Sequence, residues 1–290
     1  VKQRQLLRRG DILFCASSGS KGLVGKAALV RENMPVTFGA FCCVLRPKEN
    51  EAEYLAHYFQ SQQYRRAIEK VCSGSNINNL KAANFFSLVV PHYDDDSTRV
   101  ISALFDSIDA QIKHAKNQIA NLDSLVKSRF IEMFGDPNDQ RPSTFIEDGF
   151  SIRDDLRKPL SGAERSGMHD GELYPYYGAN GVVDYINSYL TDFDALCFAE
   201  DCGSYGARES STYVIEGRGW VNNHAHLLKP KEDCLLRYAD TYFYLSDLNR
   251  LISGTTRTKL TQAQLKQIRF EIPSLDLRRR FTAFYCQVDK

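Results

Sequence analysis

Residues 101–109 read Ile101-Ser-Ala-Leu-Phe-Asp-Ser-Ile108-Asp109, and a matching stretch returns as Phe281-Thr-Ala-Phe-Tyr-Cys-Gln-Val288-Asp289. Apolar residues recur three and four positions apart in both stretches, as on one face of a helix. The two stretches lie 180 positions apart. The sequence therefore predicts two helices that begin at matching points of a repeated unit.

Further landmarks of this repeat lie upstream of both stretches and in the same order. The run Gly10-Asp-Ile-Leu-Phe14 corresponds to the run Asp194-Ala-Leu-Cys-Phe198 with Asp11 paired to Asp194, and Pro47 and Pro91 correspond to Pro230 and Pro273. The polar loops 74–80 and 254–260 match as well. Five landmarks in one order, offset by 180 to 183 positions, indicate a tandem duplication. A duplicated chain has the pseudo-twofold form of a dimer, which suits a partner with two sites.

The two copies differ at their ends. The second copy opens near Ser151 with about forty residues that have no counterpart in the first, which has nine residues before Gly10. We therefore expect about forty residues to be missing from the front of the first module. We also expect the second helix to be cut after about three turns.

The longest regular pattern lies between the two modules. Asp94 to Ser97 supply acidic residues and an N-cap, and Gly135 with Pro137 supplies a stop, so residues 98–134 are predicted to form one helix. Its apolar residues alternate four and three apart, the heptad seam of a coiled coil, and the helix that starts near Phe281 is its expected antiparallel mate. The residues expected to pair are Ile101, Ile108, Ile112, Ile119, Leu122 and Val126.

The predicted fold class is α+β. Short apolar runs broken by Gly, Ser and Pro in residues 10–47 predict strands, whereas residues 51–71 change to helical spacing. We expect two tandem α+β modules at residues 1–96 and 136–276. A spacer helix is expected at residues 97–135, and the start of a second helix at residues 277–290.

Composition limits the class of protein. The net charge is +1, from 37 basic and 36 acidic residues, and this average does not exclude nucleic acid because charges can segregate by face. None of the eight cysteines forms a CxxC pair, and several lie in apolar runs, so we expect them to be reduced and buried. From these cysteines we expect a cytoplasmic protein, and because no apolar run reaches the ~18 residues of a membrane helix we expect a soluble one.

The most specific stretch runs from Tyr174 to Leu228. It contains Tyr174-Pro-Tyr-Tyr-Gly-Ala-Asn-Gly-Val-Val-Asp-Tyr-Ile186, then Ala199-Glu-Asp-Cys-Gly-Ser-Tyr-Gly206, then Gly219-Trp-Val-Asn-Asn-His-Ala-His-Leu-Leu228. In this order, with each strand-like run entering a Gly/Asn-rich turn, the stretch resembles the target recognition domain of type I restriction–modification specificity subunits. The Arg9-Gly-Asp-Ile-Leu13 start and the long heptad helix resemble that family too.

The resemblance implies a non-catalytic reader of double-stranded DNA. Two recognition domains would read the halves of a split, asymmetric target. The helices between them would dock methyltransferase subunits, two in number, and a restriction subunit would join the complex. S-adenosylmethionine, ATP and Mg²⁺ would then reside on partner subunits, with no cofactor on this chain and no membrane partner.

The candidate DNA contacts lie in turns of both modules. Asparagine and histidine side chains can read base edges, tyrosines can reach phosphates, and lysines and arginines can clamp them. The competing interpretation is structural: tyrosines pack inward, asparagines occupy left-handed turn positions, and polar loops are simply solvated. The candidates are Tyr177, Asn180, Tyr205, Arg208, Asn222, Asn223, His224, Arg257 and Lys259 in the second module, and Lys21 and Lys26 in the first.

His224 and His226 would share one face of a strand, as in a metal site, although such a site needs further ligands and we expect none.

Two other functions remain open on the sequence: a DNA methyltransferase or nuclease that acts through its own site, and a coiled-coil scaffold. A methyltransferase should show an Asn/Asp-Pro-Pro-Tyr/Phe element and a Gly-rich cofactor loop, and the sequence contains neither. Nor does a nuclease or hydrolase pattern stand out. The remaining alternative is a coiled-coil scaffold that binds only protein.

Overall fold

The computed structural model describes residues 6–48, 50–72, 80, 84–85, 87–201, 203–252 and 258–289. The chain forms two compact units, residues 1–117 and 118–290, and the division falls inside the long helix α4 (Asp95–Phe134). The separate module and spacer boundaries expected from the sequence stay a prediction. No helix in the described ranges combines the length and apolar character that crossing a membrane requires.

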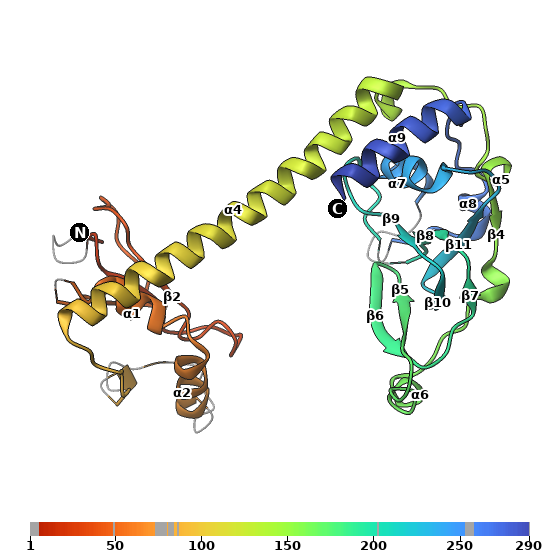
Figure 1. Cartoon of the computed structure of the whole chain (residues 1–290). Helices are drawn as coiled ribbons and strands as arrows, with labels where there is room; N and C mark the ends of the chain where they lie inside the picture. Colours follow the sequence, from red (N-terminus) through yellow and green to blue (C-terminus); the bar gives the residue numbers. More distant parts are fainter. Residues whose placement is uncertain are drawn as a thin grey trace. The chain divides into compact units, whose positions relative to one another are not determined.

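The first unit is built on a three-stranded antiparallel sheet in the order β2-β1-β3. Ile12 and Phe14 of β1 are fully buried beneath the helices, because alternate side chains of a strand point to one face. Figure 1 shows α1 and β2 beside the first half of α4. The strands and helices of this unit are β1 (Ile12–Cys15), β2 (Ala27–Leu29), β3 (Cys42–Leu45), α1 (Ala52–Tyr58) and α2 (Gln62–Cys72).

An ion pair between the buried Asp11 and the partly exposed Arg46 joins the start of β1 to the end of β3. Asp11 is 1% exposed and accepts hydrogen bonds from Nε and Nη2 of Arg46, both at 2.7 Å, and from the amide of Arg8 at 2.8 Å. Burial raises the pKa of Asp11, but the Arg46 and Arg8 hydrogen bonds more than offset it, so the pKa is lowered. The folded state therefore favours the ionised carboxylate.

This pair makes the stability of the first unit depend on pH. The folded pKa of Asp11 lies below the unfolded value of about 3.9, so its contribution is present above that value and is lost as pH falls through the folded pKa. Urea unfolding of the wild type and of Asp11→Asn should give a difference in unfolding free energy that is largest near pH 7. That difference should shrink below about pH 4; a difference that stayed constant down to pH 2.5 would contradict the assignment.

The second unit contains two four-stranded sheets, in the orders β6-β5-β10-β7 and β4-β11-β8-β9. The larger core lies between the second sheet and helices α7 and α9, together with the last turns of α4 (Figure 1). The strands are β4 (Phe150–Ile152), β5 (Tyr174–Gly178), β6 (Gly181–Ile186), β7 (Thr191–Asp192), β8 (Ala195–Ala199), β9 (Thr212–Ile215), β10 (Arg218–Val221) and β11 (Ala225–Pro230). The helices are η2 (Pro137–Asp139), α5 (Ile146–Gly149), η3 (Asp154–Leu156), α6 (Gly162–Ser166), α7 (Leu235–Leu245), η4 (Asn249–Leu251), α8 (Gln262–Leu265) and α9 (Leu275–Val288).

The duplication predicted from the sequence is visible in the strand order. In the second unit β9, β8 and β11 pair in the order in which β2, β1 and β3 pair in the first, all antiparallel. Leu80 donates its amide to Ala16 O, just after β1, and Leu260 donates to Glu200 O, just after β8, both at 2.7 Å. The α+β fold class and the repeat are confirmed.

Helix α4 begins three residues earlier than predicted and ends at the predicted residue. Asp94 caps it by accepting from the amide and the hydroxyl of Ser97, both at 2.8 Å. Gly135 follows the helix with a φ of +81°, a left-handed conformation that glycine adopts without strain. The cap and the stop therefore act as the sequence indicated.

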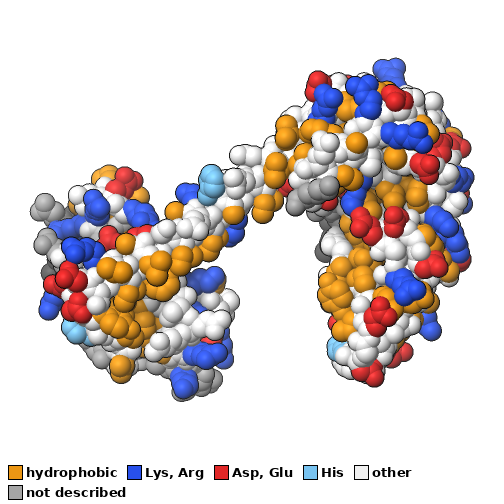
Figure 2. Space-filling model, viewed as in Figure 1, with side chains coloured by type: hydrophobic (Ala, Val, Ile, Leu, Met, Phe, Trp, Pro, Cys, Tyr) orange, Lys and Arg blue, Asp and Glu red, His pale blue; other side chains and the backbone are white. Residues whose placement is uncertain are grey.

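The heptad seam of α4 is largely open to solvent. Ile108, Ile112 and Leu122 are 41%, 48% and 42% exposed, and Ile119 is 62% exposed. Val126, by contrast, is buried in the core of the second unit. Figure 2 shows apolar side chains along the helix. Pairing of the whole seam with another helix stays a prediction.

Helix α9 docks against the last turns of α4 within the second unit. Phe281 is fully buried, and its ring centroid lies 5.4 Å from that of Phe130 and 5.7 Å from that of Phe134. Arg278 is buried and donates to the carbonyls of Pro273 and Asp233. The two helices run in opposite directions here (Figure 1).

Candidate nucleic-acid interface

A tight turn projects from the first sheet of the second unit. It joins β5 to β6 through Ala179 and Asn180, and Gly181 completes it with a φ of +108°. Asn180 is exposed, so its amide group is available to a ligand. Tyr176 points inward, and its hydroxyl accepts from the amide of Leu160 at 2.9 Å.

A second segment, residues 222–224, meets this turn. The amide of Asn222 donates to Tyr177 O at 3.1 Å, and Asn222 Oδ1 accepts from the amide of His224 at 2.7 Å. His224 Nδ1 lies 3.0 Å from Asp201 Oδ1, and the imidazole is 44% exposed. The two segments therefore present an amide and an imidazole from neighbouring backbone turns.

An open pocket of about 370 Å³ lies between these segments, and we call it the turn pocket. Its polar groups come from two asparagines, a histidine and a carboxylate, which together offer hydrogen-bond donors and acceptors. A base edge in a DNA groove presents the complementary groups. The lining residues are Gly178, Ala179, Asn180, Val183, Asp201, Asn222 and His224.

Two predicted contacts in this region are mostly buried. Tyr177 is 9% exposed and stacks on Tyr213, with ring centroids 5.8 Å apart. Burial raises the pKa of the Tyr177 hydroxyl. Asn222 is 7% exposed and holds the His224 backbone. The structure thus brings Asn180, Asn222 and His224 together, with Asn223 exposed beside them, and gives Tyr177 and Asn222 supporting positions.

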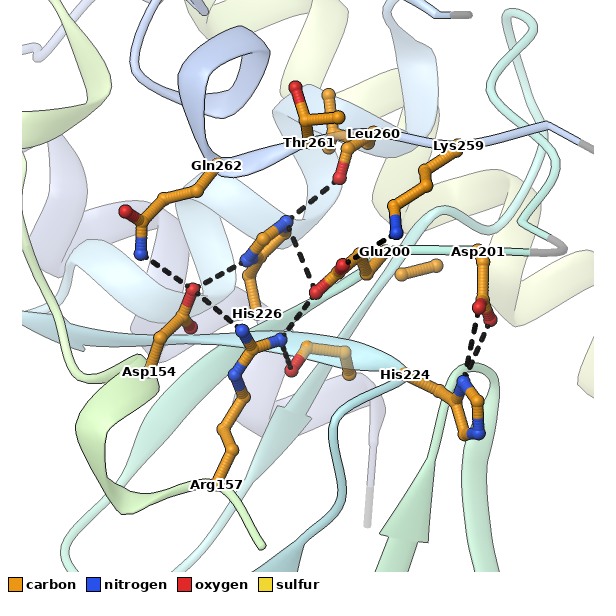
Figure 3. Close-up of polar contacts among 12 residues, drawn as sticks. Asp154, Arg157, Glu200, Asp201, His224, His226, Lys259, Leu260, Thr261 and Gln262 are labelled. Atoms are coloured by element: carbon orange, nitrogen blue, oxygen red, sulfur yellow. Dashed lines mark hydrogen bonds and ion pairs between the residues drawn. The ribbon is translucent and has the colours of Figure 1, made fainter. Parts of the chain in front are cut away.

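Beside the turn pocket lies a buried polar network centred on His226 (Figure 3). His226 is 1% exposed, with Nδ1 2.7 Å from Asp154 Oδ2 and Nε2 2.9 Å from Leu260 O. Both partners are acceptor oxygens, so each ring nitrogen of His226 faces a hydrogen-bond acceptor. Asp154 also accepts from the amide of Leu227 and from Gln262. His226 therefore joins η3, β11 and the segment at Leu260.

The network continues from Asp154 to the predicted phosphate-binding loop. Arg157 contacts Asp154 at 3.1 Å and Glu200 at 2.7 Å. Glu200 also binds Lys259 Nζ at 3.2 Å, and Lys259 stays 51% exposed. The backbones of Lys259 and Asp201 form an isolated antiparallel β-bridge, which places this segment next to the turn pocket. A cation thus lies beside the amide and imidazole groups of the turn pocket.

The electrostatics of the network favour ionised carboxylates. Burial raises the pKa of Asp154, but hydrogen bonds from His226, Leu227 and Gln262 outweigh it, and the pKa is lowered. The pKa of Glu200 is lowered in the same way, with Arg157, His226 and Lys259 outweighing burial. Both groups therefore remain anionic at neutral pH.

The prediction for Tyr205 does not fit the structure. Tyr205 is 2% exposed, and its hydroxyl donates to Ala199 O at 2.8 Å, so the side chain supports the backbone after β8 and presents no surface to DNA. Arg208 is exposed in a turn with a φ of +66°, and its amide donates to Tyr244 O. It is not among the residues that line the turn pocket.

The first unit keeps its candidate cations on the surface. Lys21 and Lys26 are exposed in the turn between β1 and β2, and Arg65 fixes that turn by donating to the carbonyls of Lys21 and Val24. The amide-rich loop at residues 73–79 and the predicted contact Arg257 lie outside the described residues. Contact of Lys21 and Lys26 with phosphate stays a prediction.

The paired histidines do not converge on a metal. His226 is buried and directed at Asp154 and Leu260, whereas His224, which precedes β11, is directed at Asp201 (Figure 3). The expectation that they share a face is therefore wrong, because the strand starts after His224. Across the described ranges, no group of three or more His, Cys, Asp or Glu residues is placed to hold a metal ion.

Sequence reasoning missed the residues that organise this region. Asp154 and Arg157 lie in the opening of the second module, three positions apart, and Glu200 follows a buried strand. A carboxylate directly after an apolar strand is a usable signal, since loops at strand ends carry functional groups. Arg157 and Lys259, the partners of Glu200, are brought to it only by the tertiary fold.

Comparison with known proteins adds independent observations. A family model described as the type I restriction modification DNA specificity domain matches residues 2–123 and 165–280. The chain is 35% identical over 128 residues to the type I restriction enzyme StySPI specificity subunit of Salmonella potsdam, and 34% identical over 128 residues to the EcoKI specificity subunit of Escherichia coli K12. Each match covers 44% of this chain and 28% of the relative.

Solved structures share the fold. The S subunit of a type I restriction–modification system from M. genitalium superposes with a TM-score of 0.62 at 17% sequence identity. The superposition covers 97% of this chain and 76% of that one. The likeness therefore extends over both units and α4, at the level of fold.

Proposed function

The chain belongs to the family of type I restriction–modification DNA specificity domains, and from this membership we propose that it is the non-catalytic DNA-reading component of such a system. The matched segments span only 28% of the first two relatives, so the activity of the whole relatives enters here as a proposal. The observation that carries it is the turn pocket with Lys259 beside it. Amide and imidazole groups there suit base edges, and the ammonium suits a phosphate.

A bipartite, asymmetric target follows from the repeat. Both units contain the same three-stranded core, yet the residues at the matching loops differ: Lys259 in the second unit corresponds to Asn79 in the first. Two related readers with different side chains would bind two different half-sites. Double-stranded DNA with a split recognition sequence is therefore the proposed ligand.

Partner subunits would supply the chemistry. We propose that two methyltransferase subunits bring S-adenosylmethionine and that a restriction subunit brings ATP and Mg²⁺, all in the cytoplasm. The exposed seam of α4 offers an apolar surface for pairing and docking. The charges of the units are mixed on the face seen in Figure 2, which fits local phosphate contacts better than one broad basic surface.

Lys259→Ala should weaken DNA binding across all sequences. A lost phosphate contact should reduce the slope of log K against log salt by about 0.9, measured by filter binding at several salt concentrations. Lys266→Ala is the matched control, since Lys266 is 46% exposed and also pairs with a carboxylate, Glu147, at 3.0 Å. Equal salt slopes for both variants and the wild type would place the phosphate contact elsewhere.

Asn180→Ala should change which sequences are preferred. Loss of a base contact costs about 1 to 3 kcal/mol at the base concerned and nothing at others. Selection from random duplexes with the wild type and the variant measures this effect. Unchanged preference, with or without a change in overall affinity, would remove Asn180 from the reading surface.

The purified chain should neither bind S-adenosylmethionine nor transfer methyl groups, because the required sequence elements are absent. Incubation with radiolabelled S-adenosylmethionine and DNA tests this, and methyl transfer by the chain alone would favour the methyltransferase alternative. Absence of any salt-dependent DNA binding would instead favour the protein-binding scaffold.

A further inference from the structure

An exposed valine lines the turn pocket beside its polar groups. Val183 lies on β6, and its side chain is 58% exposed. A single exposed apolar side chain is common on protein surfaces, so exposure alone gives it no role. The backbone around Val183, however, fixes where this side chain lies.

A β-bulge sets Val183 apart from the other residues of β6. Tyr176 pairs with Asp184 and Tyr177 pairs with Val182, so Val183 is the extra residue of the bulge. A bulge re-aims the side chain of the bulged strand, and bulges are frequent beside functional sites. The bulge therefore explains why Val183 lines the turn pocket, whereas its neighbour Val182 is not among the described lining residues.

Gly178 leaves the space that Val183 occupies. A Cβ atom at position 178 would lie 2.9 Å from Val183 Cγ1, closer than real contacts allow, and 3.7 Å from Asn222 Nδ2. The methyl groups of the valine and the amide group of Asn222 thus meet over the same glycine. The β5–β6 hairpin (Figure 1) therefore holds an apolar surface next to hydrogen-bonding groups.

This mixture of groups matches one kind of base pair. In the major groove an A·T pair presents a donor and an acceptor on adenine and the C5-methyl group on thymine, whereas a G·C pair has no methyl group. An asparagine amide can bind the adenine edge with two hydrogen bonds, and an apolar side chain can contact the methyl group. The turn pocket offers both groups, because the exposed Asn180 lies only three residues before Val183.

We propose that Val183 contacts the C5-methyl group of a thymine in the major groove, in a base pair whose adenine edge faces the asparagines of the turn pocket. This contact rests on the proposed function, since it adds a specificity-determining residue to the same DNA-binding surface. Val183 selects by an apolar contact, whereas Asn180 selects by hydrogen bonds. Uracil lacks only the methyl group of thymine, so the contact can be tested without altering a hydrogen bond of the base pair.

Deoxyuridine substitution tests the contact with the full chain. Duplexes that the wild type selects from random sequences are synthesised again with each thymine replaced singly by deoxyuridine, and Kd is measured by filter binding at one salt concentration. At one thymine the wild type should bind about fourfold more weakly, as expected for one buried methyl group. The same replacement should leave the Kd of Val183→Ala almost unchanged, because the apolar partner is gone.

Val182→Ala is the matched control. Val182 is the neighbouring valine of the same strand and is 46% exposed, so this variant should keep the full deoxyuridine effect. A second probe separates the two pyrimidines that carry a C5-methyl group. A duplex with 5-methylcytosine opposite guanine at the sensitive position should bind more weakly than the thymine duplex, because the adenine edge is lost.

The outcomes that overturn this contact differ from those that overturn the proposed function. Salt-dependent, sequence-selective binding without any thymine sensitive to deoxyuridine would leave the DNA-reading function standing and remove the Val183 contact. An equal deoxyuridine effect in Val183→Ala would assign the methyl group to another side chain, and loss of the effect in Val182→Ala would assign it to the fold of β6. Equal or tighter binding of the 5-methylcytosine duplex would show that adenine is not required. Absence of salt-dependent DNA binding would remove the function and the contact together.

Discussion

Replacement of Asp154 by alanine should lower the free energy of unfolding of the second unit by about 3 to 5 kcal/mol. The carboxylate is 9% exposed and accepts from His226, Gln262 and the amide of Leu227. Its removal leaves Nδ1 of the buried His226 without its acceptor and takes away one of the two carboxylates that Arg157 contacts, and an uncompensated buried polar group is costly. Urea unfolding at pH 7 measures the change.

Asp155→Ala is the matched control. Asp155 is the neighbouring residue and is 60% exposed, and its partner Arg153 is 34% exposed. Exposed pairs of this kind contribute about 0 to 1 kcal/mol, so the control should unfold close to the wild type. Similar losses for the two variants would show that the Asp154 network does not hold the second unit together.

Phe281→Ala should be the other strongly destabilising change, by about 3 to 5 kcal/mol. The side chain is fully buried and packs against the rings of Phe130 and Phe134, so its loss leaves a cavity between α9 and the end of α4. We expect a lower unfolding midpoint, together with faster hydrogen exchange in residues 275–288.

Cys286→Ala provides the comparison on the same helix. Cys286 is exposed, and a substitution at such a site usually changes stability by no more than about 0.5 kcal/mol. If Phe281→Ala proved as mild as this control, α9 would not depend on its contact with α4.

The fold was largely predictable because its signals are local. The N-cap at Asp94 and the glycine at 135 mark the ends of α4, and heptad spacing marks its apolar seam. The repeat was readable because matching residues occupy matching strands. The β5–β6 sheet could not be placed from the sequence, since its partner β10 joins it in parallel from more than thirty residues away.

The candidate site was predictable only where a turn exposes its own side chains. Asn180 and His224 fit this description, and both lie at the turn pocket. Tyr205 was wrong because its burial depends on long-range packing. The network was missed for the same reason: Asp154 and His226 are 72 positions apart and meet only in the folded chain.

The ion pair between Lys259 and Glu200 has a consequence for how DNA is searched. A lysine already held by a carboxylate must leave it to reach a phosphate, so under the proposed function its phosphate contact at any sequence is partly offset by the lost ion pair. At the correct target, the proposed base contacts add to this weakened phosphate contact. We therefore expect short dwell times at wrong sites and faster sampling of successive sites. Correct and wrong DNA sequences should then differ mainly in the dissociation rate of the complex.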